Sequence, residues 1–265
     1  LLTDNVHMEV KEMYIATSTL ESILKAIMLS KLADNAAIIH QKQQKNSLFQ
    51  TGTKVDNYDF KTVYLKYIQE YKRIEWLEAG KINALQKSIF FYDRHQQVSF
   101  GLMVKVCKQA LEQGVGYVLS KVSNEACKFR EQASSVKKEL HRMHGFIRLT
   151  PCGDSRIMTG YAEPEHNIGD LIVARFRKQY QDKVIIINTP DNTYIGDEKG
   201  VYISKVPSKD FSKLVEEEQS KDEFKEYWLT YYKSQFIESR KNRRLAMQNL
   251  PQKYWSWLAE GQCME

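Results

Sequence analysis

The longest regular pattern in the chain lies between Asn124 and His144. Its apolar residues follow one another at alternating steps of three and four, and they are Ala126, Phe129, Ala133, Val136, Leu140 and Met143. That spacing places them along one side of an α-helix, as a seam that packs against other elements. Gly145 is expected to end this helix. The pattern therefore predicts a fold organised around one long, partly buried helix.

Shorter helical stripes precede this segment. Ser18–Leu32, Phe60–Gly80 and Phe100–Gln113 carry apolar residues at helical spacing, whereas Lys42–Lys54 is polar and is predicted to form a loop. Only 12 Gly and 5 Pro occur among the 265 residues, which leaves few forced turns and favours long helices over a many-stranded sandwich. We therefore expect residues 1–145 to form a helical region.

Strand-like segments follow residue 145. The predicted strands are Phe146–Thr150, Ile157–Ala162, Val184–Ile187, a short one near Tyr194, and Val201–Ser204, with a helical stripe over Ile168–Tyr180. This strand–strand–helix–strand–strand order predicts a small antiparallel sheet with a helix on one face over residues 146–206. Residues 207–265 are expected to return to helix and to pack back. The predicted fold class is α+β, mainly helical, in one integrated domain.

Cysteine spacing and hydropathy argue against several classes of protein. The four cysteines contain no Cys-x-x-Cys pair, so a zinc ribbon, an iron–sulfur cluster and a redox-active dithiol lack support. The chain has no run of about 18 apolar residues that could cross a membrane, and its first residues lack the layout of a signal peptide. We expect a cytoplasmic protein without cofactor or membrane contact.

Histidines near the end of the long helix raise the question of a metal site. Glu139 and His141 would point about 160° apart on a helix, so they cannot ligate one ion together. His141 and His144 would lie about 60° apart, and His166 could join them from elsewhere. The alternative is that these imidazoles form hydrogen bonds beside the sheet. That alternative is favoured, and no metal site is predicted.

Polar residues also gather in Ala162–Asn167, between a predicted strand and a predicted helix. Loops carried by rigid elements often hold functional groups, and the carboxylates and imidazole here could serve acid–base chemistry. The alternative that they are ordinary cap and loop residues is favoured. No nucleophile motif or phosphate-cradling glycine motif accompanies them. The candidate catalytic residues are Glu139, His141, Arg148, Glu163 and His166.

The C-terminal part of the chain concentrates positive charge beside aromatic residues. Tyr227–Leu258 has six basic residues and one acidic residue, a net +5, whereas Lys209–Glu226 has four basic and seven acidic residues, a net −3. Cations and aromatics together are typical of surfaces that grip a phosphate backbone, although a solvated helix end explains part of the charge. The predicted contacts with nucleic acid or a partner are Arg142, Lys233, Arg240, Lys241, Arg243, Arg244 and Lys253, with Trp255 stacking on a base.

Three motifs carry a resemblance to a known family. They are Val136-x-x-Glu139-x-His141-Arg142-x-x-Gly145-Phe146-x-Arg148, then Ala162-x-Pro164-x-His166-Asn167, then Trp228 … Ile237-x-x-Arg240-x-Asn242-x-x-Leu245 … Pro251-x-x-Tyr254-Trp255. In this order they resemble an uncharacterised bacterial family called probable DNA metabolism proteins, over roughly Ile15 to the end. Members occur fused to a uracil-DNA-glycosylase-like domain or beside a radical-SAM protein assigned to DNA modification or repair. The resemblance implies a context in DNA metabolism and no particular mechanism.

The chain departs from the family pattern at several positions. Arg175-Phe176 stands where relatives typically have His-Phe, and Asn188 stands where they have Asp. The end motif, which has a basic residue and Arg before Tyr-Trp in relatives, reads Gln252-Lys253 here. If the family catalyses a reaction that uses that His and Asp, this chain has lost that reaction.

Three functions are consistent with these features. The leading hypothesis is an accessory protein of DNA metabolism or repair that binds DNA or a DNA-acting enzyme. The second is an adaptor for a radical-SAM or uracil-DNA-glycosylase-like partner. The third is an enzyme that acts on a base or nucleotide through a Glu/His/Arg site. A purely structural alternative is that Glu139 pairs with Arg142, and that Arg148 and Arg240 pair with buried carboxylates, to tie the helices to the sheet.

Overall fold

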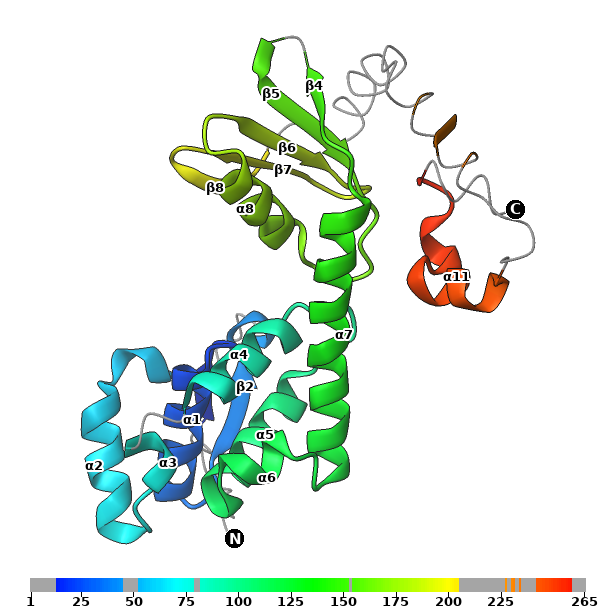
Figure 1. Cartoon of the computed structure of the whole chain (residues 1–265). Helices are drawn as coiled ribbons and strands as arrows, with labels where there is room; N and C mark the ends of the chain where they lie inside the picture. The colour runs from blue at the N-terminus through cyan, green and yellow to red at the C-terminus, as the bar shows by residue number, and fades with distance from the viewer. Residues whose placement is uncertain are drawn as a thin grey trace, which may run out of the picture. The chain divides into compact units, whose positions relative to one another are not determined.

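The computed structural model describes residues 13–44, 52–78, 82–152, 154–204 and 242–258, together with residues 227, 230, 231 and 234. It divides into two compact units, residues 1–137 and 138–265, with the boundary inside the long helix α7, Asn124–Phe146 (Figure 1). The fold is mixed α/β and mainly helical, so the predicted dominance of helix is confirmed. Among the described helices, none combines the length and hydropathy needed to cross a bilayer.

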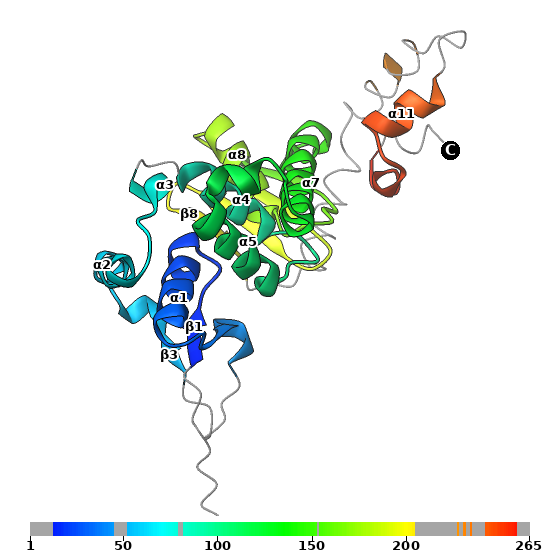
Figure 2. The same cartoon turned by 90° about the horizontal axis from the view of Figure 1, so that it is seen from below.

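The first unit contains a three-stranded parallel sheet that the sequence did not predict. Its strands are β1, Met13–Ala16, β2, Ala37–His40, and β3, Thr53–Lys54, in the order β2-β1-β3. Helix α1, Leu20–Leu32, connects β1 to β2 and packs along β1 (Figure 2). The strands are only two to four residues long, so no alternating pattern marks them in the sequence.

Helices complete the first unit. After the short 3₁₀ turns Gln41–Gln43 and Val55–Asn57 come α2, Phe60–Glu70, α3, Glu75–Glu78, α4, Ile82–Tyr92, α5, Phe100–Gln113, and α6, Val115–Leu119. The predicted α1 and α5 are confirmed, and Thr19 caps α1 by accepting the backbone N–H of Ser22 at 3.2 Å. The predicted single helix over Phe60–Gly80 is wrong, because Ile74 turns into the core and donates its N–H to the Tyr64 hydroxyl at 3.1 Å. Helix α4 was not predicted.

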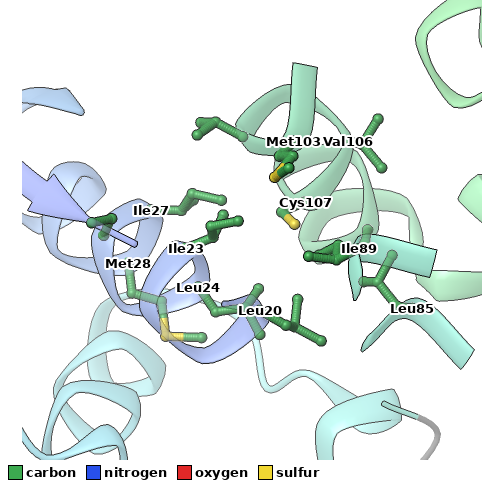
Figure 3. Close-up of a cluster of buried hydrophobic side chains, with 14 of the residues drawn as sticks. Leu20, Ile23, Leu24, Ile27, Met28, Leu85, Ile89, Met103, Val106 and Cys107 are labelled. Carbon is green, nitrogen blue, oxygen red and sulfur yellow. The ribbon is translucent and has the colours of Figure 1, made fainter. Parts of the chain in front are cut away.

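The core of the first unit lies where α1, α4 and α5 meet. Figure 3 shows side chains from these helices facing one another, and they include Leu20, Ile23, Leu24, Ile27, Met28, Leu85, Ile89, Met103, Val106 and Cys107. Each of these residues is buried. Burial of this apolar surface is the main stabilising contribution to the unit.

The second unit carries a five-stranded sheet in the order β4-β5-β6-β7-β8. The strands are β4, Thr150–Cys152, β5, Asp154–Tyr161, β6, Val184–Asn188, β7, Thr193–Asp197, and β8, Gly200–Ile203. Helix α8, Gly169–Gln179, covers one face (Figure 1), where Gly196 leaves room for Val173. Further along the chain, the described residues include α11, Arg243–Asn249, and a 3₁₀ turn, Gln252–Tyr254.

The sheet of the second unit is mixed, so the predicted antiparallel arrangement is wrong. β5 and β6 run parallel, while the other neighbouring pairs are antiparallel. The reason is α8, which carries the chain back to the starting end of β5 before β6 begins. The predicted strand Phe146–Thr150 is also displaced, because α7 continues to Phe146 and β4 starts at Thr150.

Candidate functional site

A buried carboxylate organises the second unit. Glu139 projects from α7 and is 3% exposed. Its Oε1 accepts the backbone N–H of Glu165 at 2.9 Å, and its Oε2 accepts that of His166 at 2.9 Å. The hydroxyl of Tyr254 donates to Oε1 at 2.8 Å. Three donors therefore offset the cost of burying this acid, and they tie a loop and the C-terminal segment to one helix.

A lysine joins the same carboxylate from the surface. Lys253 forms an ion pair with Glu165, and its Nζ lies 3.8 Å from the Glu139 Oε1. The Lys253 side chain is 44% exposed, so solvent screens these attractions. We call Glu139, Glu165, His166, Lys253 and Tyr254 the Glu139 cluster. All five belong to the second unit.

Aromatic contacts hold Pro251–Leu258 against the unit. The Tyr254 ring lies 5.6 Å from that of Phe146 and 6.2 Å from that of Trp257. Trp257 in turn contacts the Tyr161 ring at 6.3 Å, where β5 ends. Tyr254, Trp255 and Leu258 are buried, so this short segment is anchored by packing as well as by the Glu139 hydrogen bond.

Burial shifts the ionisation of two residues in the cluster. It lowers the pKa of His166 below the ordinary value, although the Glu139 and Glu165 carboxylates partly oppose the shift. The imidazole is therefore neutral near pH 7. Burial also raises the pKa of Tyr254, the hydrogen bond to Glu139 raises it further, and Arg142 partly opposes this. The Tyr254 hydroxyl thus remains a donor at physiological pH.

The cluster lies at the carboxyl ends of the parallel strands. Tyr161 ends β5 and pairs with Asn188, which ends β6, and the loop that supplies Glu165 and His166 follows directly. The backbone N–H of Ala162 donates to the Asn188 carbonyl at 3.0 Å, which fixes the start of this loop. In α/β sheets this edge is where ligands commonly bind. The position makes the cluster a candidate site.

Three motifs that are distant in the sequence thus meet in one place. Glu139 comes from the first, His166 from the second, and Tyr254 from the third. The hydrogen bonds to Glu139 join residues 26, 27 and 115 positions apart. The motif pattern marks these residues in the sequence, but their mutual contacts depend on the tertiary fold.

Asn188 is neutral where the resembling family has an acid. Its side chain is fully buried, accepts the Thr193 hydroxyl through Oδ1, and has no partner for Nδ2 among the described residues. An aspartate at this position would introduce a buried negative charge instead. Asn188 therefore carries no charge at the strand end, and both N–H donors of its Nδ2 group are unpaired among the described residues.

The other departure from the family pattern lies on α8. Arg175 is exposed there, and its positive charge lowers the pKa of His144 on α7. The pKa of His144 falls to about 4, chiefly through burial and further through Arg175 and His141. His144 packs its ring against Phe176 at 5.7 Å, and its buried Nε2 has no partner in the described part of the chain.

The structure separates the candidate catalytic residues. Glu139 and His166 are together, and Glu163, on the same loop as His166, accepts the Tyr161 hydroxyl at 2.8 Å. His141 and Arg148 are exposed and do not enter the buried cluster. No set of three or more His, Cys, Asp and Glu in the described ranges could hold a metal ion.

The predicted binding residues also fall into different settings. Arg142 is half-buried, Arg244 is exposed on α11, and Lys253 belongs to the Glu139 cluster. Lys233, Arg240, Lys241 and the side chain of Arg243 lie outside the described residues. Trp255 is 7% exposed and donates its indole N–H to the Leu250 carbonyl at 3.0 Å, so its ring packs inside the unit.

Two exposed rings in the basic segment were not predicted as contacts. Tyr227 is 69% exposed and Tyr231 is 56% exposed. Both are helical, and their spacing of four residues was a signal available in the sequence. The sequence does not reveal which of these rings are buried. In the structure Trp255 is buried, whereas Tyr227 and Tyr231 are exposed.

Comparison with known proteins gives a family without an assigned activity. Residues 97–260 match the family model described as DUF4130, a domain of unknown function. The match covers the whole Glu139 cluster and more than half of the chain. No curated protein matches the chain.

Proposed function

The chain belongs to the DUF4130 family, and from this premise we propose that it is an accessory protein of DNA metabolism that binds nucleic acid. The binding surface is the basic part of Tyr227–Leu258. The observation that carries the proposal is the net charge of +5 in this segment, beside exposed aromatic rings. The resemblance to probable DNA metabolism proteins supplies the context.

The physical reason is the release of counterions. A nucleic acid carries a dense line of phosphates with condensed cations, and each Lys or Arg that replaces one of them adds affinity. Four of the basic residues, Arg240, Lys241, Arg243 and Arg244, fall within five positions. Arg244 is exposed. Such a short cationic run neutralises several neighbouring phosphates at once.

Anchoring of the next segment supports the proposal. Tyr254, Trp255 and Leu258 are buried, and Tyr254 donates to the buried Glu139. The basic run precedes this anchored segment by only a few residues. Holding one end of a binding segment in place reduces the conformational entropy that it loses when it binds.

DNA binding measured at increasing salt concentration tests whether the basic residues contact the phosphates. We expect the wild-type protein to bind labelled DNA, with an affinity that falls steeply as salt rises from about 50 to 200 mM. Replacing Arg240, Lys241, Arg243 and Arg244 by Ala should lower the slope of log affinity against log salt by about three. Fluorescence anisotropy measures both quantities.

A second quadruple variant, which removes the same number of charges elsewhere, tests whether the effect belongs to the C-terminal segment. Lys61, Lys66, Lys72 and Arg73 are exposed in the first unit, and their replacement by Ala removes the same number of charges. This variant should keep most of the salt slope. Equal slopes for both quadruple variants and the wild type would overturn the proposal. If the protein binds no DNA but co-elutes with a radical-SAM or glycosylase-like protein, the adaptor function replaces it.

One observation favours a second candidate, an enzyme that acts on a base or nucleotide. His166 is neutral near pH 7, buried, and held beside Glu139 at the carboxyl ends of β5 and β6. A neutral imidazole is a suitable general base. Both oxygens of Glu139 accept backbone N–H groups, so Glu139 would position the loop and His166 would exchange the proton.

Product analysis distinguishes the enzyme from the binding protein. The purified chain is incubated with nucleotides and with oligonucleotides that contain modified bases, and products are identified by mass spectrometry. The enzyme hypothesis expects turnover that His166→Asn abolishes and that His141→Asn, at an exposed position, preserves. Turnover that survives His166→Asn would remove His166 from this role.

A further inference from the structure

The exposed side of α7 within the second unit carries positive charge and no acid. Lys138 is exposed there, and Arg142, one helical turn later, is half-buried on the same side. The remaining exposed positions up to the end of the helix are His141 and Gly145. Glu139 is the single acid between residues 138 and 146, and it is buried with three donors on its oxygens. No exposed carboxylate on this part of the helix therefore neutralises the cations.

Helix α8 adds two cations beside the same part of α7. The two helices lie side by side (Figure 1), and the rings of His144 and Phe176 meet between them at 5.7 Å. Arg175 and Lys178 are exposed on α8, three residues apart and so on neighbouring parts of its surface. Burial is the main cause of the low pKa of His144, and the nearby charge of Arg175 lowers it further. The acid of α8, Asp170, lies in its first turn.

We call Lys138, Arg142, Arg175 and Lys178 the α7–α8 basic face. None of these four side chains forms an ion pair within the described part of the chain. Residues 138–204 contain nine basic and nine acidic residues, a net charge of zero, so the face is positive because the charges are separated. The helix dipole accounts for Lys178, in the last turn of α8, but not for Lys138 and Arg175.

The α7–α8 basic face continues the binding surface proposed above. Burial and the hydrogen bond to Glu139 raise the pKa of Tyr254, and the nearby charge of Arg142 partly opposes this rise. Tyr254 belongs to the anchored segment that follows the basic run, and Lys253 precedes it directly. Cations thus extend from the anchored segment, across the exposed side of α7, to α8. A row of cations without intervening acids is complementary to a row of phosphates.

We propose that the α7–α8 basic face is a second contact for the phosphate backbone, so that a bound nucleic acid extends from the C-terminal segment over α7 to α8. The inference rests on the proposed nucleic-acid binding and extends its site. Neither α8 nor residues 138–146 of α7 expose an aromatic ring on which a base could stack. This face therefore contacts the backbone without selecting a base sequence.

The experiment measures salt slopes with labelled DNA duplexes. The triple variant Lys138→Gln, Arg175→Gln and Lys178→Gln changes only exposed positions, so the packed interior stays intact. We expect the slope of log affinity against log salt to fall by about two to three, and affinity at about 100 mM salt to fall at least tenfold. The loss should be equal for two duplexes of unrelated sequence, because the contacts are made to phosphates. Fluorescence anisotropy measures affinity and slope.

Two control variants separate the effect of charge from that of position. The first exchanges Lys for Arg, or Arg for Lys, at the same three positions, so it keeps every charge and should bind like the wild type. The second, Lys61→Gln with Lys66→Gln and Lys72→Gln, removes three exposed charges from the first unit and should keep most of the slope. Equal losses in the triple Gln variant and in either control would overturn the inference.

The outcomes distinguish this inference from the function on which it rests. If the triple Gln variant keeps the wild-type slope while the Ala variant of the C-terminal basic run lowers it, the α7–α8 contact is overturned and the proposed function stands. A loss confined to one duplex sequence also overturns the contact. Wild-type binding to vesicles that contain phosphatidylglycerol, in place of DNA, would assign the face to a membrane surface. A wild-type protein that binds neither duplex refutes the proposed function itself.

Discussion

Each unit contains a strand–helix–parallel strand segment, and the two differ in how their strand ends are held. In the first unit, polar groups at the carboxyl ends of β1 and β2 pair with groups of the same strand–helix–strand segment. Thr19 caps α1, and Ser18 Oγ lies 3.1 Å from His40 Nε2. In the second unit, the loop after β5 is held by Glu139, which lies 26 and 27 residues away, and Glu139 also holds Tyr254.

The pairing of Ser18 with His40 also limits the proton transfers in which His40 can take part. His40 Nδ1 accepts the backbone N–H of Lys42 at 3.2 Å, so in the neutral ring the proton is on Nε2 and is donated to Ser18. His40 therefore cannot take a proton from that serine. Segments of the same topology can therefore hold their strand ends in two ways, by polar groups of the segment itself or by a buried carboxylate from an element outside it.

Of the substitutions that test this difference between the units, removal of the Glu139 side chain should lower the free energy of unfolding most. Glu139→Ala leaves two backbone N–H groups and the Tyr254 hydroxyl without their acceptor. We expect the free energy of unfolding to fall by about 3–5 kcal/mol, as measured by chemical denaturation. Glu131→Ala on the same helix, at a side chain 61% exposed, should cost less than about 1 kcal/mol. Similar losses for both variants would contradict the central role of Glu139.

Loss of the Tyr254 hydroxyl alone should have a smaller effect. Tyr254→Phe keeps the ring contacts and removes one donor to Glu139. We expect a loss of about 1–2 kcal/mol in the free energy of unfolding. Tyr71→Phe removes a hydroxyl that donates to the Lys31 carbonyl at an exposed site and should change stability by under about 0.5 kcal/mol. If Glu139→Ala also removes the effect of Tyr254→Phe, the two side chains act as a pair.

The Thr19 cap in the first unit should contribute less to the free energy of unfolding. Thr19→Ala removes the side-chain acceptor for the Ser22 N–H and should cost about 1 kcal/mol. Thr19→Ser retains the acceptor and should restore most of this stability. Thermal unfolding followed by circular dichroism measures both variants. A loss as large as that of Glu139→Ala would mean that the two strand ends do not differ in the way described.

Substitution of His144 should have the smallest effect at neutral pH, and its effect should grow on the acid side. Its pKa in the folded protein is about 4, below the ordinary value of 6.5, so the unfolded chain binds a proton that the folded chain resists. Stability is therefore lost as pH falls from about 6.5 towards 4. His144→Gln should lose less stability over this range. Parallel pH profiles for variant and wild type would show that another group controls acid sensitivity.

Long periodic helices were the most predictable elements of the fold. α7 follows the seam that contains Phe129 and Val136, and α5 follows its predicted bounds. The parallel pairing of β5 with β6 was not predicted, because strand pairing depends on the path of the intervening chain. The three strands of the first unit were missed because they are too short to show a period.

For the candidate site, the amino-acid sequence was enough to show which residue types stand in the motifs and how much charge the C-terminal segment carries. It placed Glu139 and His166 in one candidate catalytic set and Lys253 among the binding residues, but it did not predict the contacts that these residues make. The folded structure was needed to show that Glu139 is buried among donors from two distant segments, and that Trp255 packs inside while Tyr227 and Tyr231 are exposed. The physical reason is that periodicity and charge are properties of neighbouring residues, whereas burial and hydrogen-bond satisfaction depend on segments more than a hundred residues apart.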